Sequence, residues 1–332
     1  MVPRRHILLA LAVAALWGIN FVAIDYALES FPPLLLGALR FTLVAFPAVF
    51  FLPRPPIAWR YVVGVGLSLS TVQFGLLFVS IHVGMPAGLA SLVIQLNAVF
   101  TVALAVAFLG ERPGARQLAG ALVAFGGIGL IAADRSGSHV PIGAFLLCVG
   151  AAASWGIGNV MVRMAQAPNA LALMVWSALV APLPLLGLSL AFEGPSDISR
   201  ALLHASVKSI GGLLFVVIVA SLFGYGSWAW LIRRHATSKV APFSLLVPVF
   251  GIGSAWIALA ERPTPLEIAG AVVVICGLGL VTVSLRRAPR GRCAAALPGG
   301  PPSSPRPGRR AAGGRRTRTS RGRAGSRRGA AP

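Results

Sequence analysis

The sequence predicts an all-α polytopic membrane protein with ten transmembrane helices, arranged as two inverted five-helix repeats. Three observations predict this fold: long apolar segments with short breaks, a low charge content, and motifs that recur in both halves. Of the 332 residues, 56% are hydrophobic and 11% are charged. Soluble domains carry about 25% charged residues, so lipid is expected around most of this chain.

The apolar segments are long enough to cross a bilayer, which takes roughly 20 residues in a helix. A lone apolar run at the N-terminus would be typical of a signal peptide. Here nine further runs follow, and no small-residue cleavage site interrupts the first. The predicted spans are 7–27, 34–52, 61–80, 87–109, 117–133, 142–162, 171–190, 210–232, 240–259 and 267–285.

The basic residues predict that both termini face the cytoplasm, with the spans in the inner membrane of the cell. Cytoplasmic loops carry an excess of Lys and Arg. With the N-terminus inside, the loops before the tail hold ten basic residues on the cytoplasmic side and four outside. The inner set is Arg4, Arg5, Arg54, Arg60, Arg112, Arg116, Arg163, Arg233, Arg234 and Lys239, and the outer set is Arg135, Arg200, Lys208 and Arg262.

Motifs recur between the halves. Glu111-Arg112-Pro113 returns 150 residues later as Glu261-Arg262-Pro263, and Trp17-Gly18 is matched by Trp155-Gly156. Because each half contains five spans, an odd number, the second half enters the bilayer upside down. Inverted repeats of this kind are typical of secondary transporters with a substrate site between the halves. The predicted organisation is a first repeat over 1–137, a second over 138–286, and a disordered basic cytoplasmic tail over 287–332.

Several of these motifs resemble those of a known family. The residues are Trp17-Gly18-Ile19-Asn20 in the first span, Leu39-Arg40-Phe41 in the second and Gly110-Glu111-Arg112 after the fourth. They are similar to the EamA-type drug/metabolite transporters, and the resemblance covers roughly 5–285. Within that family, segments such as 84–93 and 240–248 are most similar to bacterial exporters of cysteine and O-acetylserine. The resemblance implies efflux of such metabolites by alternating access; another amino acid or an amphiphilic drug is the alternative substrate.

Polar side chains within the spans are candidates for a substrate cavity, because such groups are costly in lipid. Amides can accept from an ammonium and donate to a carboxylate. Alternatively, they bond neighbouring helices. The amide candidates are Asn20, Gln73, Gln95, Asn97 and Asn159.

Arg40 is the basic residue well inside a span, and it could hold a substrate carboxylate through a bidentate contact. Its alternative is to extend towards the interface. Trp17, Trp155 and Tyr225 are candidates for the cavity wall, although aromatic residues in membrane helices also serve as interfacial anchors.

Gating candidates lie at span ends. Glu111 and Glu261 are equivalent in the two repeats, and inversion places them on opposite sides of the membrane. Pairing with Arg112, Arg116 or Arg262 is the expected gating contact, and a plain helix-end charge is the alternative. Pro248 interrupts the ninth span, where a proline frees a backbone carbonyl and bends the helix.

An enzyme is disfavoured, because the five histidines lie at or near span ends or in loops and no HExxH or GxSxG motif occurs. A scaffold would not need an inverted repeat. No cofactor or metal is expected, and the expected partners are a small-molecule substrate and the lipid bilayer. A proton or another ion is a candidate for coupling, and a second copy of the chain is a candidate for a homodimer. The tail has three interpretations: anionic-lipid binding, non-specific RNA binding, or an incidental extension.

Overall fold

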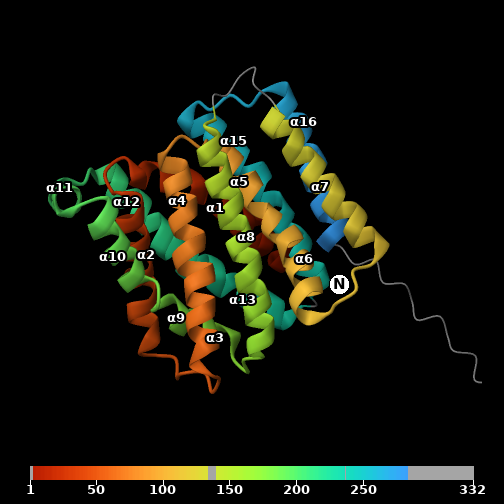
Figure 1. Ribbon diagram of the computed structural model, residues 1–332, viewed down its shortest axis with the longest axis horizontal. Coiled ribbons are helices and arrows are strands. Elements are labelled where there is room, and N and C mark those ends of the chain that lie inside the picture. The colour runs from red at the N-terminus through yellow and green to blue at the C-terminus, as the bar shows by residue number, and fades with distance from the viewer. Residues whose placement is uncertain (1–2, 134–139, 236, 283–332) are drawn as a thin grey trace, which may run out of the picture. The chain divides into compact units, whose positions relative to one another are not determined.

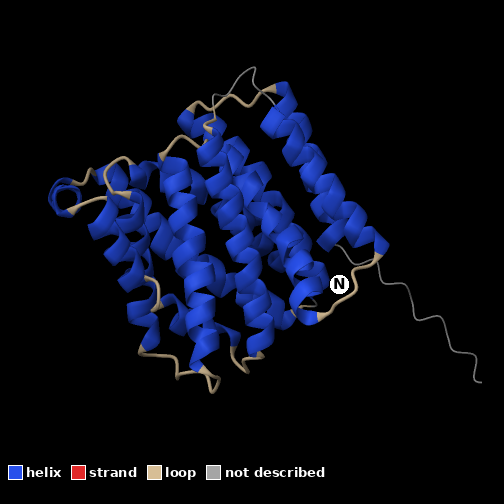
Figure 2. Ribbon diagram, in the orientation of Figure 1, coloured by secondary structure: helices blue, strands red, loops and turns tan. Residues whose placement is uncertain are grey.

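The computed structural model describes residues 3–133, 140–235 and 237–282. These residues form helices joined by loops, and no strand occurs among them (Figure 2). Seven of the helical stretches are long and apolar enough to cross a membrane, and shorter apolar helices cover Pro33–Phe46, Ala115–Ile131 and Pro265–Val281. The predicted tail and the predicted boundary between the repeats lie outside the described residues.

The first half of the chain follows the predicted spans closely. Proline begins α2, where its missing N–H costs no helical hydrogen bond. The elements are α1 (Arg4–Leu28), α2 (Pro33–Val49), α3 (Trp59–Val65), η1 (Gly66–Val72), α4 (Gln73–His82), α5 (Ala87–Val93), η2 (Ile94–Leu96), α6 (Asn97–Leu109) and α7 (Ala115–Ala133).

The second half has a similar order with two differences: the position of α2 is occupied by two helices, α9 and α10, and one short helix is added. The short helix α11 lies between the seventh and eighth predicted spans, where the sequence analysis placed only a loop. Pro195 begins it and its buried side chains are Ile198 and Ala201, which makes it amphipathic. The elements are α8 (Ile142–Ala165), α9 (Ala170–Ala178), α10 (Pro182–Phe192), α11 (Pro195–His204), α12 (Val207–Leu214), η3 (Phe215–Tyr225), α13 (Gly226–Arg234), α14 (Thr237–Val240), η4 (Ala241–Leu246), α15 (Val247–Leu259) and α16 (Pro265–Thr282).

Each half contains two irregular segments that the sequence analysis did not predict. A π-helical segment, η1 or η3, interrupts the helix that runs from α3 to α4 or from α12 to α13. A 3₁₀ segment, η2 or η4, precedes α6 or α15. Such interruptions shift the register of backbone hydrogen bonds, and π segments are frequent at functional sites.

α6 and α15 end in the same way. Gly110 has φ 64° and Ala260 has φ 56°, and both adopt the left-handed conformation that closes a helix. The next residue donates its N–H back into the helix, from Glu111 to Ala105 O at 3.3 Å and from Glu261 to Ala255 O at 3.4 Å. The matched ends therefore place each glutamate directly after its helix.

Glycines line the most extensive contact among the described helices, between α7 and α16, which run side by side (Figure 1). A Cβ on Gly120 would lie 2.6 Å from Gly277 O, and one on Gly127 would lie 2.8 Å from Gly270 O. The earlier residue of α7 meets the later residue of α16, so the helices are antiparallel. These glycines therefore allow close packing within the chain.

α1 packs on α15 and α8 packs on α6 through equivalent glycines. A Cβ on Gly18 would lie 2.5 Å from Phe250 Cβ, and one on Gly156 would lie 2.7 Å from Phe100 Cβ. Each helix is therefore in backbone contact with an element from the other half. The described helices share one compact unit with a common apolar core.

Candidate functional site

Arg40 is buried in the middle of α2, with only 3% of its surface exposed. Its guanidinium carbon lies 3.7 Å from the centre of the Phe74 ring, which is a cation–π contact. The Nη2 group donates a hydrogen bond to Ser221 Oγ of η3 at 3.2 Å. Nε and Nη1 are buried and have no hydrogen-bond partner in the described part of the chain. Buried donors without acceptors are costly, and both groups have the chemistry to donate to an anion.

No ion pair joins Arg40 to a carboxylate of the described residues, because those carboxylates are engaged elsewhere or lie beside another cation. Glu29, Glu111 and Asp197 form ion pairs with other residues, Glu193, Glu261 and Glu267 accept from backbone N–H groups, and Asp25 lies near Lys208. The positive charge of Arg40 therefore lacks a counter-ion from the described protein.

Asn20 of α1 supplies the opposite kind of unsatisfied group. It is 8% exposed, and its Oδ1 is buried without a hydrogen-bond partner among the described residues. One turn earlier, Trp17 Nε1 donates to Ala220 O of η3 at 3.0 Å, and the Trp17 ring lies 5.4 Å from that of Tyr225. The Tyr225 side chain is also an electrostatic neighbour of the Arg40 guanidinium. Consecutive turns of η3 thus hold α1 and α2 together around these polar groups.

Gln73 is the third buried polar side chain near this position, with 2% of its surface exposed. It begins α4, directly before the Phe74 ring that covers Arg40. Trp17, Asn20, Arg40, Gln73 and Tyr225 are therefore the predicted site residues that the structure places on the helices meeting around η3 and α4. We call these five residues the central polar cluster.

The remaining predicted site residues lie at other helix contacts. Gln95 Nε2 donates to Ser244 O at 3.3 Å and connects η2 to η4. Asn159 Nδ2 donates to Thr101 Oγ1 at 3.0 Å between α8 and α6, and Asn97 Nδ2 donates to Ile94 O in its own helix. Trp155 packs against the apolar core. Gln95 and Asn159 thus bond to neighbouring segments, which was the alternative interpretation, whereas Asn97 bonds to a carbonyl three residues earlier.

Glu261 fastens the start of α5. Its Oε1 accepts from Ala87 N at 2.7 Å and its Oε2 accepts from Gly88 N at 3.0 Å. A carboxylate at a helix N-terminus satisfies free N–H groups and complements the helix dipole. Burial away from water raises the pKa of the Glu261 carboxyl, and the two N–H groups oppose that rise. The expected pairing with Arg262 is replaced by this contact.

Glu111 forms an ion pair with Arg163, the last basic residue of α8, rather than with Arg112 or Arg116. Arg163 Nη1 lies 3.3 Å from Glu111 Oε2. Both side chains are about half exposed, so water screens the pair. Glu111 follows the C-terminal end of α6, whereas Glu261 contacts the N-terminal end of α5. The two glutamates therefore act at opposite ends of the same helical stretch, Ala87–Leu109.

Pro248 is buried at the second position of α15, directly after η4. At this position the missing proline N–H is one that an α-helix leaves unbonded. It therefore helps the 3₁₀ segment pass into a regular helix.

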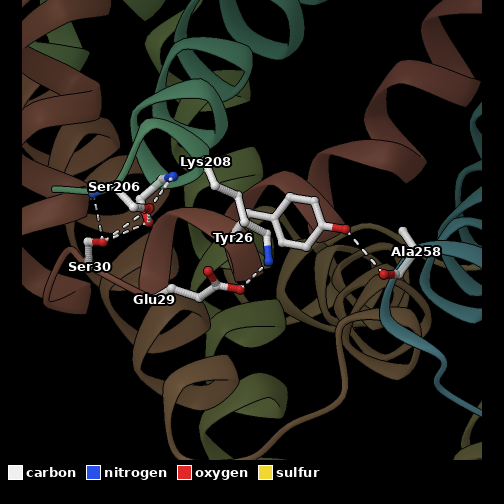
Figure 3. A network of polar contacts seen from close by, with 7 residues as sticks. Tyr26, Glu29, Ser30, Ser206, Lys208 and Ala258 are labelled. Atoms are coloured by element: carbon white, nitrogen blue, oxygen red, sulfur yellow. Dashed lines mark hydrogen bonds and ion pairs between the residues drawn. The ribbon is translucent and has the colours of Figure 1, made fainter.

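A polar network joins the end of α1 to the start of α12 and to the end of α15 (Figure 3). The sequence analysis missed this network. Lys208 Nζ lies 2.5 Å from Glu29 Oε1 and 3.9 Å from the centre of the Tyr26 ring. The Tyr26 hydroxyl donates to Ala258 O at 3.2 Å, and Ser30 Oγ accepts from Ser206 N at 3.2 Å. Each residue alone resembles an ordinary loop residue, so only its spatial neighbours identify the network.

Two further contacts at helix ends were also missed. Glu193 accepts from the N–H groups of Leu34 and Leu35, at 2.6 and 3.1 Å, and caps α2, the helix that carries Arg40. At the other end of α1, His6 Nδ1 lies 2.7 Å from His235 Nε2. These partners are more than 150 residues apart in sequence, and no local pattern indicates them.

The helices and the buried polar groups together define a multi-pass membrane protein. The EamA-like transporter family matches residues 4–133 and 142–283, and the chain belongs to this family. It is 45% identical over 280 residues to a "Probable amino-acid metabolite efflux pump" of Salmonella typhimurium, covering 83% of this chain and 94% of that protein. A protein of the same name from Escherichia coli is 43% identical, covering 85% and 96%.

A more distant relative and a solved structure extend these comparisons. A "Probable terminal-alkyne amino-acid exporter" of Streptantibioticus cattleyicolor is 28% identical, with 64% of this chain and 69% of that protein covered. A solved crystal structure that is 20% identical aligns with a TM-score of 0.55 over 84% of this chain and 97% of the other. At that identity the alignment supports the fold alone.

Proposed function

We propose that the chain is a secondary transporter that exports small amino-acid metabolites by alternating access. The observation that carries this proposal is the unsatisfied chemistry of the central polar cluster. Arg40 offers buried N–H donors and an unneutralised positive charge, while Asn20 offers a buried acceptor. The relatives named as amino-acid metabolite efflux pumps support the same substrate class.

An α-amino acid complements both groups. Its carboxylate would accept a charge-assisted hydrogen bond from one of the two free groups of Arg40, Nη1 or Nε, and bonds of this kind are the strong ones. Its ammonium would donate to Asn20 Oδ1, and the rings of Trp17 and Tyr225 would add cation–π attraction. Gln73 would complete the polar wall, while Gln95, Asn159 and Trp155 would hold helices together and Asn97 would bond within its own helical stretch.

We propose ten crossings and an inverted repeat for this fold. The seven long helices and the three shorter apolar ones together supply ten crossings. Three structural matches support the repeat: the π segments, the left-handed helix ends at Gly110 and Ala260, and the equivalent contacts of Gly18 and Gly156. The excess of basic residues before the tail supports cytoplasmic termini.

Alternating access requires contacts that open at one end while those at the other end close. Glu261 on α5 and Glu111 on Arg163 are the proposed latches, because they hold opposite ends of one helical stretch. Pro248 is the proposed pivot, since it lies where η4 passes into α15. The network around Lys208 would open with the Glu261 latch, because Tyr26 connects it to the end of α15.

The proposed substrates are cysteine and O-acetylserine, and another amino acid or an amphiphilic drug is the alternative. The test is excretion from a bacterial host that expresses the full chain, with cysteine and O-acetylserine measured in the medium. Arg40→Ala and Gln73→Ala are expected to reduce excretion to the vector level, and Arg200→Ala serves as a matched loss of an exposed arginine. Vector-level excretion by the wild-type protein, shown to be in the membrane, would rule out these substrates.

A further inference from the structure

Ser221 presents its side chain to Arg40 because η3 is a π helix. Its hydroxyl donates to Val216 O at 2.7 Å, five residues earlier. Serine in an α-helix bonds instead to the carbonyl three or four residues earlier. The altered register directs the oxygen of Ser221 towards α2, where it accepts from Arg40 Nη2 at 3.2 Å.

In this contact Arg40 is the donor and Ser221 is the acceptor. A serine hydroxyl has a single proton, and Ser221 gives it to Val216 O, so Ser221 faces Arg40 only as an acceptor. It is 4% exposed, which keeps water from competing for the same nitrogen. A neutral acceptor fixes the guanidinium without neutralising it, and the Phe74 ring holds one face of the same group. Nε and Nη1 therefore stay available.

We propose that Ser221 is a positioning residue that makes the site specific for carboxylates. It orients Arg40 through one nitrogen and leaves the charge for the substrate to neutralise. A carboxylate at this position would supply an internal counter-ion and remove the requirement for an anionic substrate group. This inference rests on the proposed function, since it concerns the same central polar cluster.

The first half of the chain offers a matched control. Thr71 lies in η1, the other π segment, and its Oγ1 donates to Gly66 O, also five residues earlier, at 3.3 Å. Thr71 is buried to a similar degree, with 5% exposed. Thr71→Ala removes the same type of hydroxyl from the same type of helix, without touching the arginine.

The test uses the full-length protein in proteoliposomes, with labelled L-cysteine as the transported probe. Cysteamine, which is cysteine without its carboxylate, is the competitor. Ser221→Ala is expected to raise the half-saturating cysteine concentration about tenfold, which is the effect of losing one hydrogen bond to a charged group. The maximal rate should stay near that of the wild type, Ser221→Thr should restore the affinity, and Thr71→Ala should leave it unchanged.

Ser221→Asp distinguishes positioning from a structural role. It should weaken cysteine binding and make cysteamine compete as well as cysteine, because the aspartate neutralises Arg40. A Ser221→Ala protein with unchanged or improved cysteine affinity would overturn the inference. So would a Ser221→Asp protein that still prefers cysteine. A wild-type protein that carries no cysteine would instead overturn the proposed function, and this inference with it.

Discussion

Replacing Arg40 with lysine separates the charge of the proposed anchor from its geometry. Lysine keeps the positive charge but has a single nitrogen and no planar fork. In the structure, Nη2 is held by Ser221, while Nε and Nη1 point to opposite sides of the guanidinium and have no partner in the described part of the chain. A lysine ammonium could contact Ser221 or the substrate carboxylate. Its single nitrogen does not reproduce the three fixed N–H positions of the guanidinium.

The expected loss follows from these contacts. A hydrogen bond to a charged group contributes about 1.5–3 kcal/mol. Losing the proposed substrate bond therefore raises the half-saturating cysteine concentration by about 10- to 100-fold. The stacking of the guanidinium on Phe74 is also lost, which lowers stability further.

The assay is the concentration dependence of cysteine transport in proteoliposomes, with Arg200→Lys as the control. Arg200 is exposed and paired with Asp197 within its own helix, so its replacement should leave transport unchanged. An Arg40→Lys protein that transports cysteine with wild-type affinity would refute recognition by the guanidinium geometry. A positive charge at this position would then be sufficient.

Three other predictions concern the fold and the latches. Gly18→Ala should lower the free energy of unfolding by about 1–3 kcal/mol, because its Cβ would overlap Phe250. Gly129→Ala places its Cβ in open space and should be neutral, and the melting temperature in detergent checks both variants. Glu261→Gln should slow transport more than it weakens cysteine binding, since it removes the charge that fastens α5, and single-turnover flux against binding checks this. Glu111→Gln should cost less than about 1 kcal/mol, because that pair is exposed, and the same melting assay measures it.

The helices could be predicted from the sequence because each span is a local pattern of apolar residues. The described chain is helical over the predicted spans, and the equivalent positions of Glu111 and Glu261 lie after matching helix ends. The π segments could not be predicted, since neither Gly66–Val72 nor Phe215–Tyr225 contains a proline or another local pattern that distinguishes a π-helix from an α-helix. Their register depends on contacts with other helices.

The candidate site was only partly predictable for a similar reason. Type and location within a span identified Arg40, Asn20 and Trp17, because a polar or aromatic side chain there needs a role. For the other candidates, the role depends on a partner that is distant in the sequence. Asn159 donates to Thr101, and Glu261 accepts from the start of α5. Ser221 was overlooked, since a serine in a span carries no signal until its neighbour across the bundle is known.

The most direct measurement is counterflow of labelled L-cysteine into proteoliposomes that contain the full-length protein and are loaded with unlabelled cysteine. The account predicts transient accumulation of label, which loading with cysteamine does not support and Arg40→Ala abolishes. A time course identical to that of protein-free liposomes would contradict cysteine transport. Equal accumulation with cysteine and cysteamine inside would contradict recognition of the carboxylate by Arg40.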